Sequence, residues 1–208
     1  MSRFKSSVEI LREFFIEQSF DLYSANTRLR RSVLIELEKD LQYSIGLPGR
    51  LRDLGLEKSE WNKLQFGLPY VSPLLIYCSA VDVMARAYHK KALPPLGKNG
   101  TWFRESAELF FDYPKPLSKV LLRLRNSLSH SYSINGFVFT RGPSESDLPI
   151  MKVNKESNTH LVSTIKCLTN LRKARLKAYE VILEQSQDEI DKVAEYVSEH
   201  FIYFLVEK

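Results

Sequence analysis

Four leucines near the middle of the chain have a spacing that only a helix brings onto one face. Leu117, Leu121, Leu124 and Leu128 are separated by four, three and four residues. At 100° per residue they stay within about 60° of one another on a helix. The sequence therefore predicts a helix over residues 117–132 that buries this leucine stripe.

Apolar residues recur at helical spacing through most of the remaining chain. They predict a helix over residues 3–20 and a second that follows Asp21 or Ser24 and ends near Gly46, where glycines and Pro48 stop it. Further helices are expected at 69–91, 102–111, 159–185 and 188–205. Only residues 136–141 and 149–153 show a β pattern, and the Gly-, Pro- and Ser-rich segment between them predicts a small antiparallel hairpin.

The expected fold class is therefore mainly α, a helical bundle with a small β-hairpin insertion. We expect one domain over 1–208. N-terminal helices and a loop occupy 1–68, central helices 69–132, the hairpin 133–155 and C-terminal helices 156–208.

Composition narrows the class of protein further. With 44% apolar and 26% charged residues, the chain can bury a core, and its net charge of +5 mildly favours an anionic partner. Cys78 and Cys167, each in an apolar helical run, predict buried free thiols and exclude a disulfide scaffold. No apolar segment at the start suits a signal peptide, and Asp82 interrupts the most apolar stretch, so we expect a cytoplasmic protein without a membrane span.

Most patterns of catalytic residues are missing from the sequence. There is no phosphate-binding glycine loop, HExxH, G-x-S-x-G or CxxC, and none of the four histidines has a second histidine or a cysteine at a helical ligand spacing. We therefore expect no cofactor and no metal.

One segment does have residues suited to a catalytic site: Leu124-Arg-Asn-Ser-Leu-Ser-His130. Measured from Leu117, Asn126 falls at about 180° and His130 at about 220°, opposite the leucines. Arg125 falls at about 80°, from where its long side chain can swing toward His130. Lys119 and Arg123, at about 200° and 240°, extend the same polar face.

These residue types suit the cleavage of RNA. An imidazole can move the 2′-hydroxyl proton, and a guanidinium can stabilise the charge that develops on the phosphate. Such cleavage needs both a base and an acid, so a second histidine would have to come from a two-fold dimer. The alternative is an exposed polar helix face on which the histidine is incidental.

The segment Arg125-Asn126-x-x-x-His130 resembles the R-x4-6-H signature of the HEPN superfamily. The preceding helix, with Ser79, Ala80 and Asp82, is similar to the Ser-Ala-x-Asp helix of many HEPN proteins. His130-Ser-Tyr132 resembles the R-x4-H-x-Y form of HEPN toxins that are paired with nucleotidyltransferase antitoxins.

This resemblance implies a homodimeric helical bundle in which two motifs form one metal-independent endoribonuclease site, as in toxin, abortive-infection and antiviral-defence proteins. Arg125 would bind the scissile phosphate, Asn126 would orient it and His130 would transfer the proton. Tyr132 would be the site of modification by a cognate antitoxin or a contact for the substrate. Two other functions stay open: a non-catalytic HEPN module that binds RNA, nucleotide or a protein partner, and a purely structural helical subunit.

Other charged residues allow two interpretations. Asp82 needs a cation, and either Arg86 one turn away or Arg125 can supply it. The basic clusters at 28–31, 89–91 and 172–177 suit either a solvated helix face or contacts along an RNA backbone. The aromatic residues of the C-terminal segment, Tyr196, Phe201, Tyr203 and Phe204, suit core packing first and a dimer seam second.

Overall fold

A computed structural model gives the fold of the chain. It describes residues 5–17, 20–21, 28–53, 68–90, 99–130, 136–140, 147–153 and 158–205. Within these residues the protein is mainly helical, which confirms the coarse prediction. The helices are α1 (Ser7–Phe15), α2 (Val33–Asp53), α4 (Leu68–His89), α5 (Asn99–Leu109), α6 (Lys115–His130), α7 (Thr164–Leu183) and α8 (Gln187–His200).

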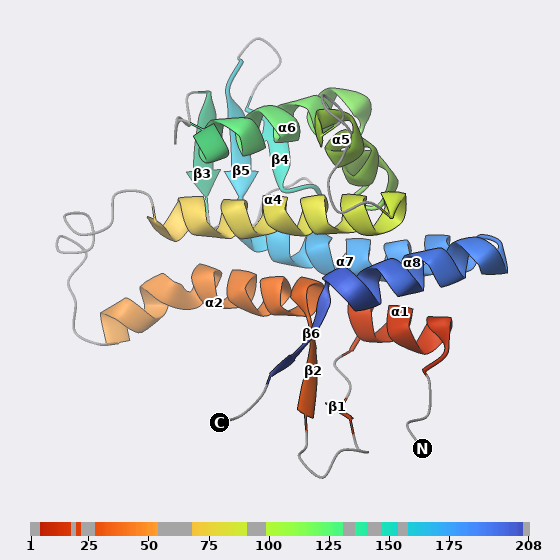
Figure 1. Cartoon of the computed structure of the whole chain (residues 1–208). Coiled ribbons are helices and arrows are strands. Elements are labelled where there is room, and N and C mark those ends of the chain that lie inside the picture. Colours follow the sequence, from red (N-terminus) through yellow and green to blue (C-terminus); the bar gives the residue numbers. More distant parts are fainter. Residues whose placement is uncertain are drawn as a thin grey trace.

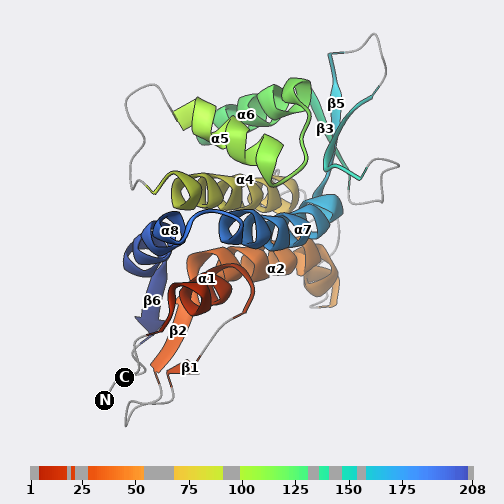
Figure 2. The same cartoon turned by 90° about the vertical axis from the view of Figure 1, so that its right-hand side faces the viewer.

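Helix α4 lies at the centre of the molecule. Helices α5 and α6 cover one side of it, and α7 and α2 cover the other (Figures 1 and 2). A helix that is apolar around most of its circumference is stable only when neighbours enclose it. Accordingly Leu74, Tyr77, Val81 and Met84 are almost fully buried, as expected for this segment. Within the described residues no helix has the length and apolar character that crossing a membrane requires.

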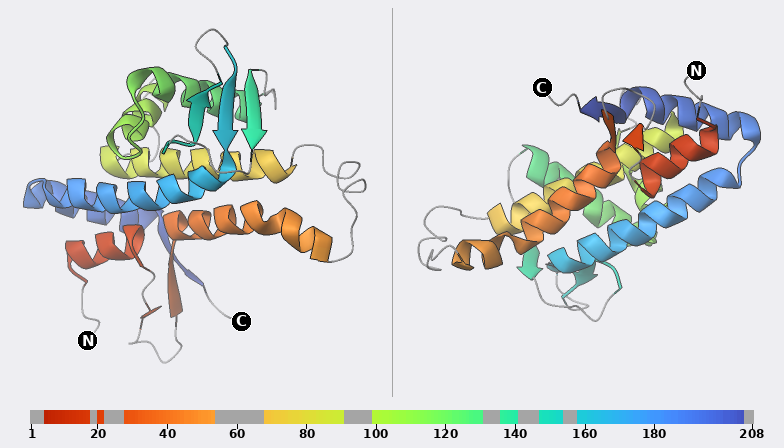
Figure 3. Two further views of the ribbon diagram at one scale, coloured as in Figure 1. Left: turned by 180° about the vertical axis from the view of Figure 1, so that it is seen from behind. Right: turned by 90° about the horizontal axis from the view of Figure 1, so that it is seen from below.

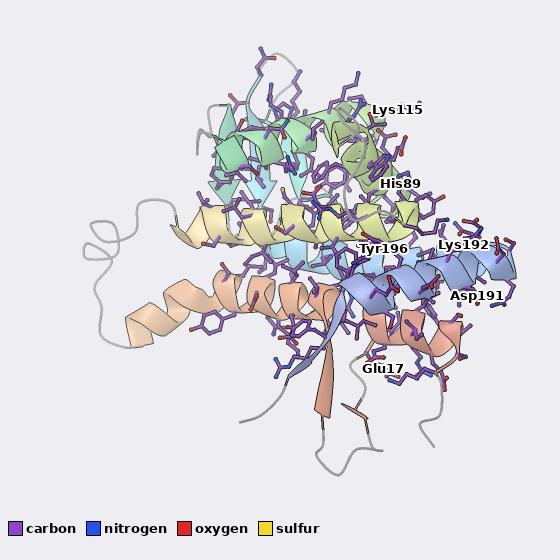
Figure 4. All side chains as sticks on the ribbon, viewed as in Figure 1. Glu17, His89, Lys115, Asp191, Lys192 and Tyr196 are labelled. Atoms are coloured by element: carbon purple, nitrogen blue, oxygen red, sulfur yellow. The ribbon has the colours of Figure 1, made fainter. Side chains whose placement is uncertain are left out.

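Helices α1 and α8 complete the side of the molecule opposite α5 and α6. Helix α1 begins with a capping box between Ser6 and Glu9, and the Ser186 hydroxyl caps α8 by accepting from the backbone N–H of Glu189. Along α8, Tyr196 is buried, whereas Lys192 is exposed to solvent (Figure 4). Both helices thus start where the sequence supplies a capping serine.

A three-stranded sheet packs against α6. It consists of β3 (Phe137–Thr140), β4 (Ile150–Lys152) and β5 (His160–Ser163) in the order β3-β5-β4. Figures 1 and 3 show α6 on one face of this sheet, where Phe137, Ile150 and Val162 are buried. The polypeptide passes directly from β5 into α7, so the sheet and the helical body are joined at that point.

The prediction of a β-hairpin is wrong. Both predicted strands form, but they do not pair with each other. Strand β5 lies between them, parallel to β3 and antiparallel to β4. Its four residues run directly into α7 and share the apolar spacing of that helix, so the sequence pattern assigned them to it.

A second sheet joins the two ends of the chain. Its strands are β1 (Phe20–Asp21), β2 (Arg28–Ser32) and β6 (Ile202–Leu205), in the order β1-β2-β6, and they extend away from the helical body (Figure 1). Leu29 is paired with Leu205 and Ser32 with Ile202. The predicted helices over 3–20 and 188–205 were therefore too long. Phe20 lies in β1, which pairs with the nearby β2, and the last residues of the second segment form β6, whose partner β2 comes from the opposite end of the chain.

Helix α2 does not end at Gly46 as predicted. It continues through Gly46, Pro48 and Gly49 to Asp53. A proline removes one backbone hydrogen bond and a glycine weakens a helix, but packing against a neighbouring helix commonly outweighs such propensities. Helix α2 packs extensively along α4, which supplies that support.

The thiols of Cys78 and Cys167 are buried and free, as predicted. Burial is the main cause that raises the pKa of each thiol above its ordinary value. Both side chains therefore stay protonated and act as small apolar groups in the core.

Candidate functional site

Helix α6 carries the candidate site and divides into two faces as its sequence predicts. Leu121, Leu124 and Leu128 are completely buried. Lys119 and Asn126, on the other side of the helix, are exposed. The angular prediction is confirmed for these residues, so the stripe fixes which way the polar face of α6 points.

Arg125 leaves α6 beside the leucine stripe and reaches across to α4. Its Nε and Nη2 atoms both donate to Oδ2 of Asp82, at 3.3 Å and 3.1 Å. Its Nη1 donates to Oδ1 of Asn126 at 3.2 Å. Of the two cations considered for Asp82, Arg125 forms the ion pair, whereas Arg86 acts on the carboxylate only through its charge.

The ion pair fixes Arg125 without using all of its hydrogen-bond donors. A guanidinium has five N–H groups, and the bonds to Asp82 and Asn126 engage three of them. The Arg125 side chain is 24% exposed. Among the residues that the structure describes, the other two N–H groups have no acceptor and can donate to an anion.

Asp82 lies between the apolar core and this polar surface. Burial raises the pKa of its carboxyl above the ordinary value, and the charge of Arg125 opposes that effect. The group therefore takes up a proton at a higher pH than an exposed aspartate does, and protonation weakens its hold on Arg125. Asp82 is in this way coupled to the position of the guanidinium.

His130 is the last residue of α6, one turn after Asn126 on the same helix. Its side chain lies outside the described part of the chain, as does the whole of Tyr132. The structure thus brings Arg125, Asn126 and Asp82 into contact and places the backbone of His130 next to them along the helix.

An open pocket of about 490 Å³ lies on the exposed side of α6, between this helix and the first turns of α5. We call it the α5–α6 pocket. Its polar lining consists of Thr101, Arg104, Lys119, Arg123, Asn126 and Ser127. None of the described residues that line it is acidic, and Asn126 belongs both to the pocket and to the predicted motif.

Gly100 allows the two helices to approach closely enough to form this pocket. A Cβ atom at this position would lie 3.0 Å from Cδ2 of Leu122 on α6. The Arg104 side chain folds back over the same turn and donates to the carbonyl oxygen of Gly100 at 3.3 Å. Sequence reasoning found Lys119, Arg123 and Asn126 but missed Thr101, Arg104 and Ser127, for which this glycine early in a helix was the available signal.

Arg123 borders the pocket on the side of the sheet. Its guanidinium lies 5.3 Å from the centre of the Phe137 ring, a distance typical of a cation–π contact. His160 is close by on β5 and is buried. Burial lowers the pKa of His160, and the charge of Arg123 lowers it further, so the imidazole is neutral at neutral pH.

The basic clusters outside α6 are largely engaged within the protein. Arg31 pairs with Glu36, Lys90 with Glu189, and Arg172 with Glu38. Arg175 is buried, which neither interpretation of its cluster anticipated. The side chains of residues 28–30 and all of Lys91 lie outside the described part of the chain.

Among the described residues, no group of three or more His, Cys, Asp or Glu side chains is arranged to hold a metal ion. The chain matches no family model, no curated protein and no solved structure.

Proposed function

We propose that the protein is a metal-independent endoribonuclease of the HEPN type that cleaves RNA at a composite site in a homodimer. The observation that supports this most is the position of Arg125, which is held by Asp82 and Asn126 on the polar side of α6 and keeps two N–H donors that no described residue engages. A guanidinium fixed in this way is suited to neutralise a phosphate as charge builds up during cleavage.

Each motif residue then has a distinct role. Arg125 binds the scissile phosphate, Asn126 orients it, and His130 transfers the proton from the 2′-hydroxyl or to the leaving group. Asp82 positions Arg125 and does not touch the RNA. Lys119 and Arg123 attract the substrate to this face of the helix.

The proposal includes an assembly and a setting. In-line cleavage requires a base and an acid, so two His130 side chains from two protomers share one site. The setting that goes with this activity is a cytoplasmic toxin or antiviral-defence effector that is controlled by a cognate antitoxin or another defence-system partner. Tyr132 is the candidate residue for modification by that partner.

A second function is favoured by the same ion pair. Because Asp82 already neutralises much of the charge of Arg125, the motif can serve to build the surface. The cations of the α5–α6 pocket, which have no carboxylate partner within the described ranges, would then bind the ligand. The protein would then be a non-catalytic HEPN module that binds RNA or nucleotide.

RNA cleavage in EDTA separates these two functions. We expect the wild type to cleave, and we expect Arg125→Ala and His130→Ala each to lower the rate by roughly 10² to 10⁴-fold. His200→Ala is the matched control, because His200 also ends a helix and is exposed, but lies on α8. Binding without cleavage by the wild type would establish the non-catalytic module, and full activity of folded His130→Ala would reject the ribonuclease.

A further inference from the structure

The α5–α6 pocket concentrates positive charge that no carboxylate neutralises. Arg104, Lys119 and Arg123 line it, and within the described part of the chain none of the three forms an ion pair. Other cations of this protein, such as Lys90 and Arg172, do have carboxylate partners. Cations gathered over one concave surface repel one another and produce a potential that favours an anion.

The neutral groups of the pocket are also those that bind phosphate. The hydroxyls of Thr101 and Ser127 and the amide of Asn126 can donate hydrogen bonds to phosphate oxygens. Arg123 is held at the rim by its contact with Phe137, and Arg104 by its bond to the Gly100 carbonyl. Two of the three cations are thus fixed in place before a ligand arrives, which reduces the entropy lost on binding.

The shape and position of the pocket favour a polymer over a small molecule. The pocket is open to solvent along the exposed side of α6, whereas sites for small ligands usually enclose them. Asn126 connects it to Arg125, so a strand whose phosphate lies at Arg125 can continue across α6 to the first turn of α5.

We propose that the α5–α6 pocket binds the backbone phosphate of a neighbouring nucleotide of single-stranded RNA, next to the phosphate held at Arg125. This inference rests on the proposed function, because it assigns the pocket to the same substrate strand. Lys119 and Arg104 supply the charge, and the hydroxyl and amide groups fix the position of the phosphate oxygens.

Binding is measured by fluorescence anisotropy with a 5′-labelled single-stranded RNA of about ten nucleotides. All variants carry His130→Ala, which slows cleavage enough for binding to be measured. We expect Lys119→Gln and Arg104→Gln each to weaken binding roughly fivefold. We also expect each to make the slope of log Kd against log salt shallower by about 0.7. Lys119 has no interaction with the described residues, so Lys119→Gln tests the pocket without disturbing the fold.

The matched control is Lys173→Gln. Lys173 is an exposed lysine on α7, which lies on the other side of α4 from α5 and α6 (Figure 2). This control changes the net charge of the protein by the same amount as Lys119→Gln. Because Lys173 lies far from the pocket, the control should leave both Kd and the salt slope close to those of the parent. An equal loss in Lys119→Gln and Lys173→Gln would show that only net charge matters, and would overturn the pocket.

Two further outcomes separate this inference from the proposed function. If the wild type does not cleave RNA but Lys119→Gln still weakens binding, the pocket stands and the ribonuclease falls. If Lys119→Gln and Arg104→Gln weaken the binding of ATP but leave RNA binding unchanged, the pocket belongs to a free nucleotide and the inference is overturned.

Discussion

Arg175 is the residue that joins three helices on the side of the molecule away from the candidate site. From α7 it donates to the carbonyl oxygens of Phe15 and Ile16 at the end of α1, at 2.7 Å and 2.9 Å, and it pairs with Glu38 of α2. Burial lowers the pKa of its guanidinium to about 10, which still leaves it charged at neutral pH. Arg175 therefore forms a buried connection between helices.

We expect Arg175→Met to lower the free energy of unfolding by about 3 kcal/mol, because it leaves two buried carbonyl groups without their donor and removes one of the two arginines that pair with Glu38. Arg172→Met is the matched control. Arg172 is 51% exposed and binds the same Glu38, so its loss should cost no more than about 1 kcal/mol. Urea denaturation measures both, and equal losses would show that Arg175 contributes no more than a surface ion pair.

His160 predicts a pH dependence of stability. Because its pKa is lowered in the folded protein, the unfolded chain binds this proton more readily than the folded chain does. The stability due to neutral His160 is thus present above its ordinary pKa of 6.5 and is lost as the pH falls through the lower folded pKa. His160→Gln should therefore lose less thermal stability than the wild type between about pH 7 and pH 5.

Melting temperatures measured across that range check this expectation. His200→Gln, at an exposed histidine, serves as the control and should follow the wild type. Parallel curves for the wild type and His160→Gln would show that His160 has the same pKa in the folded and unfolded chains.

On helix α6, the residues that stabilise the fold and the residues proposed to act on RNA lie on different faces. Leu124 and Leu128 are completely buried, so Leu124→Ala or Leu128→Ala should cost about 2 to 5 kcal/mol through lost burial and the cavity that remains. His130→Ala should cost far less, because His130 lies at the end of the helix and opposite the stripe on the helical wheel.

Thermal melts and cleavage rates, measured side by side, check this separation. Asn126→Ala is a control for the exposed face and should change stability by no more than about 0.5 kcal/mol. If His130→Ala melts as early as the leucine variants, the role of His130 is structural.

The same helix shows why parts of this fold follow from sequence. Periodicity predicts α4 and α6 well, because both have long apolar patterns and the partner of each buried face is simply the core. It fails for β2, β5 and β6, which are short and lie next to helices of similar composition. Strand β2 also pairs with β6 from the far end of the chain, and no local sequence pattern predicts that pairing.

Some residues of the candidate site could likewise be predicted from the sequence, and others could not. The direction of Asn126, Lys119 and Arg123 follows from their position on one helix. The bond from Arg125 to Asp82 was one of two open alternatives, because it depends on how α4 packs against α6. Thr101 and Arg104 could not be placed, since their nearness to α6 arises only when α5 docks at Gly100.

For the molecule as a whole, the two layers on either side of α4 have different roles. On one side, α7, α2, α1 and α8 build the larger part of the bundle, and Arg172, Arg175 and Lys192 form ion pairs within it. On the other side lie α5 and α6 (Figure 1), which form the α5–α6 pocket. Its cations Arg104, Lys119 and Arg123 have no ion pair with any residue that the structure describes. A protomer that binds RNA would therefore do so through the α5–α6 side, and a two-fold axis that unites two motifs has to pass near the end of α6.

Composite assembly predicts how mixed dimers behave. One protomer supplies one His130, and in-line cleavage needs an acid and a base at the same phosphate. A heterodimer of one wild-type chain and one His130→Ala chain, purified through two different tags, should therefore be as inactive as the His130→Ala homodimer. Two independent sites would instead retain half of the wild-type activity.

Light scattering must show a dimer at the assay concentration, and the activity per protomer should fall when the wild type is diluted until it dissociates. A heterodimer with half the activity, or a monomer that cleaves RNA, would contradict the shared site.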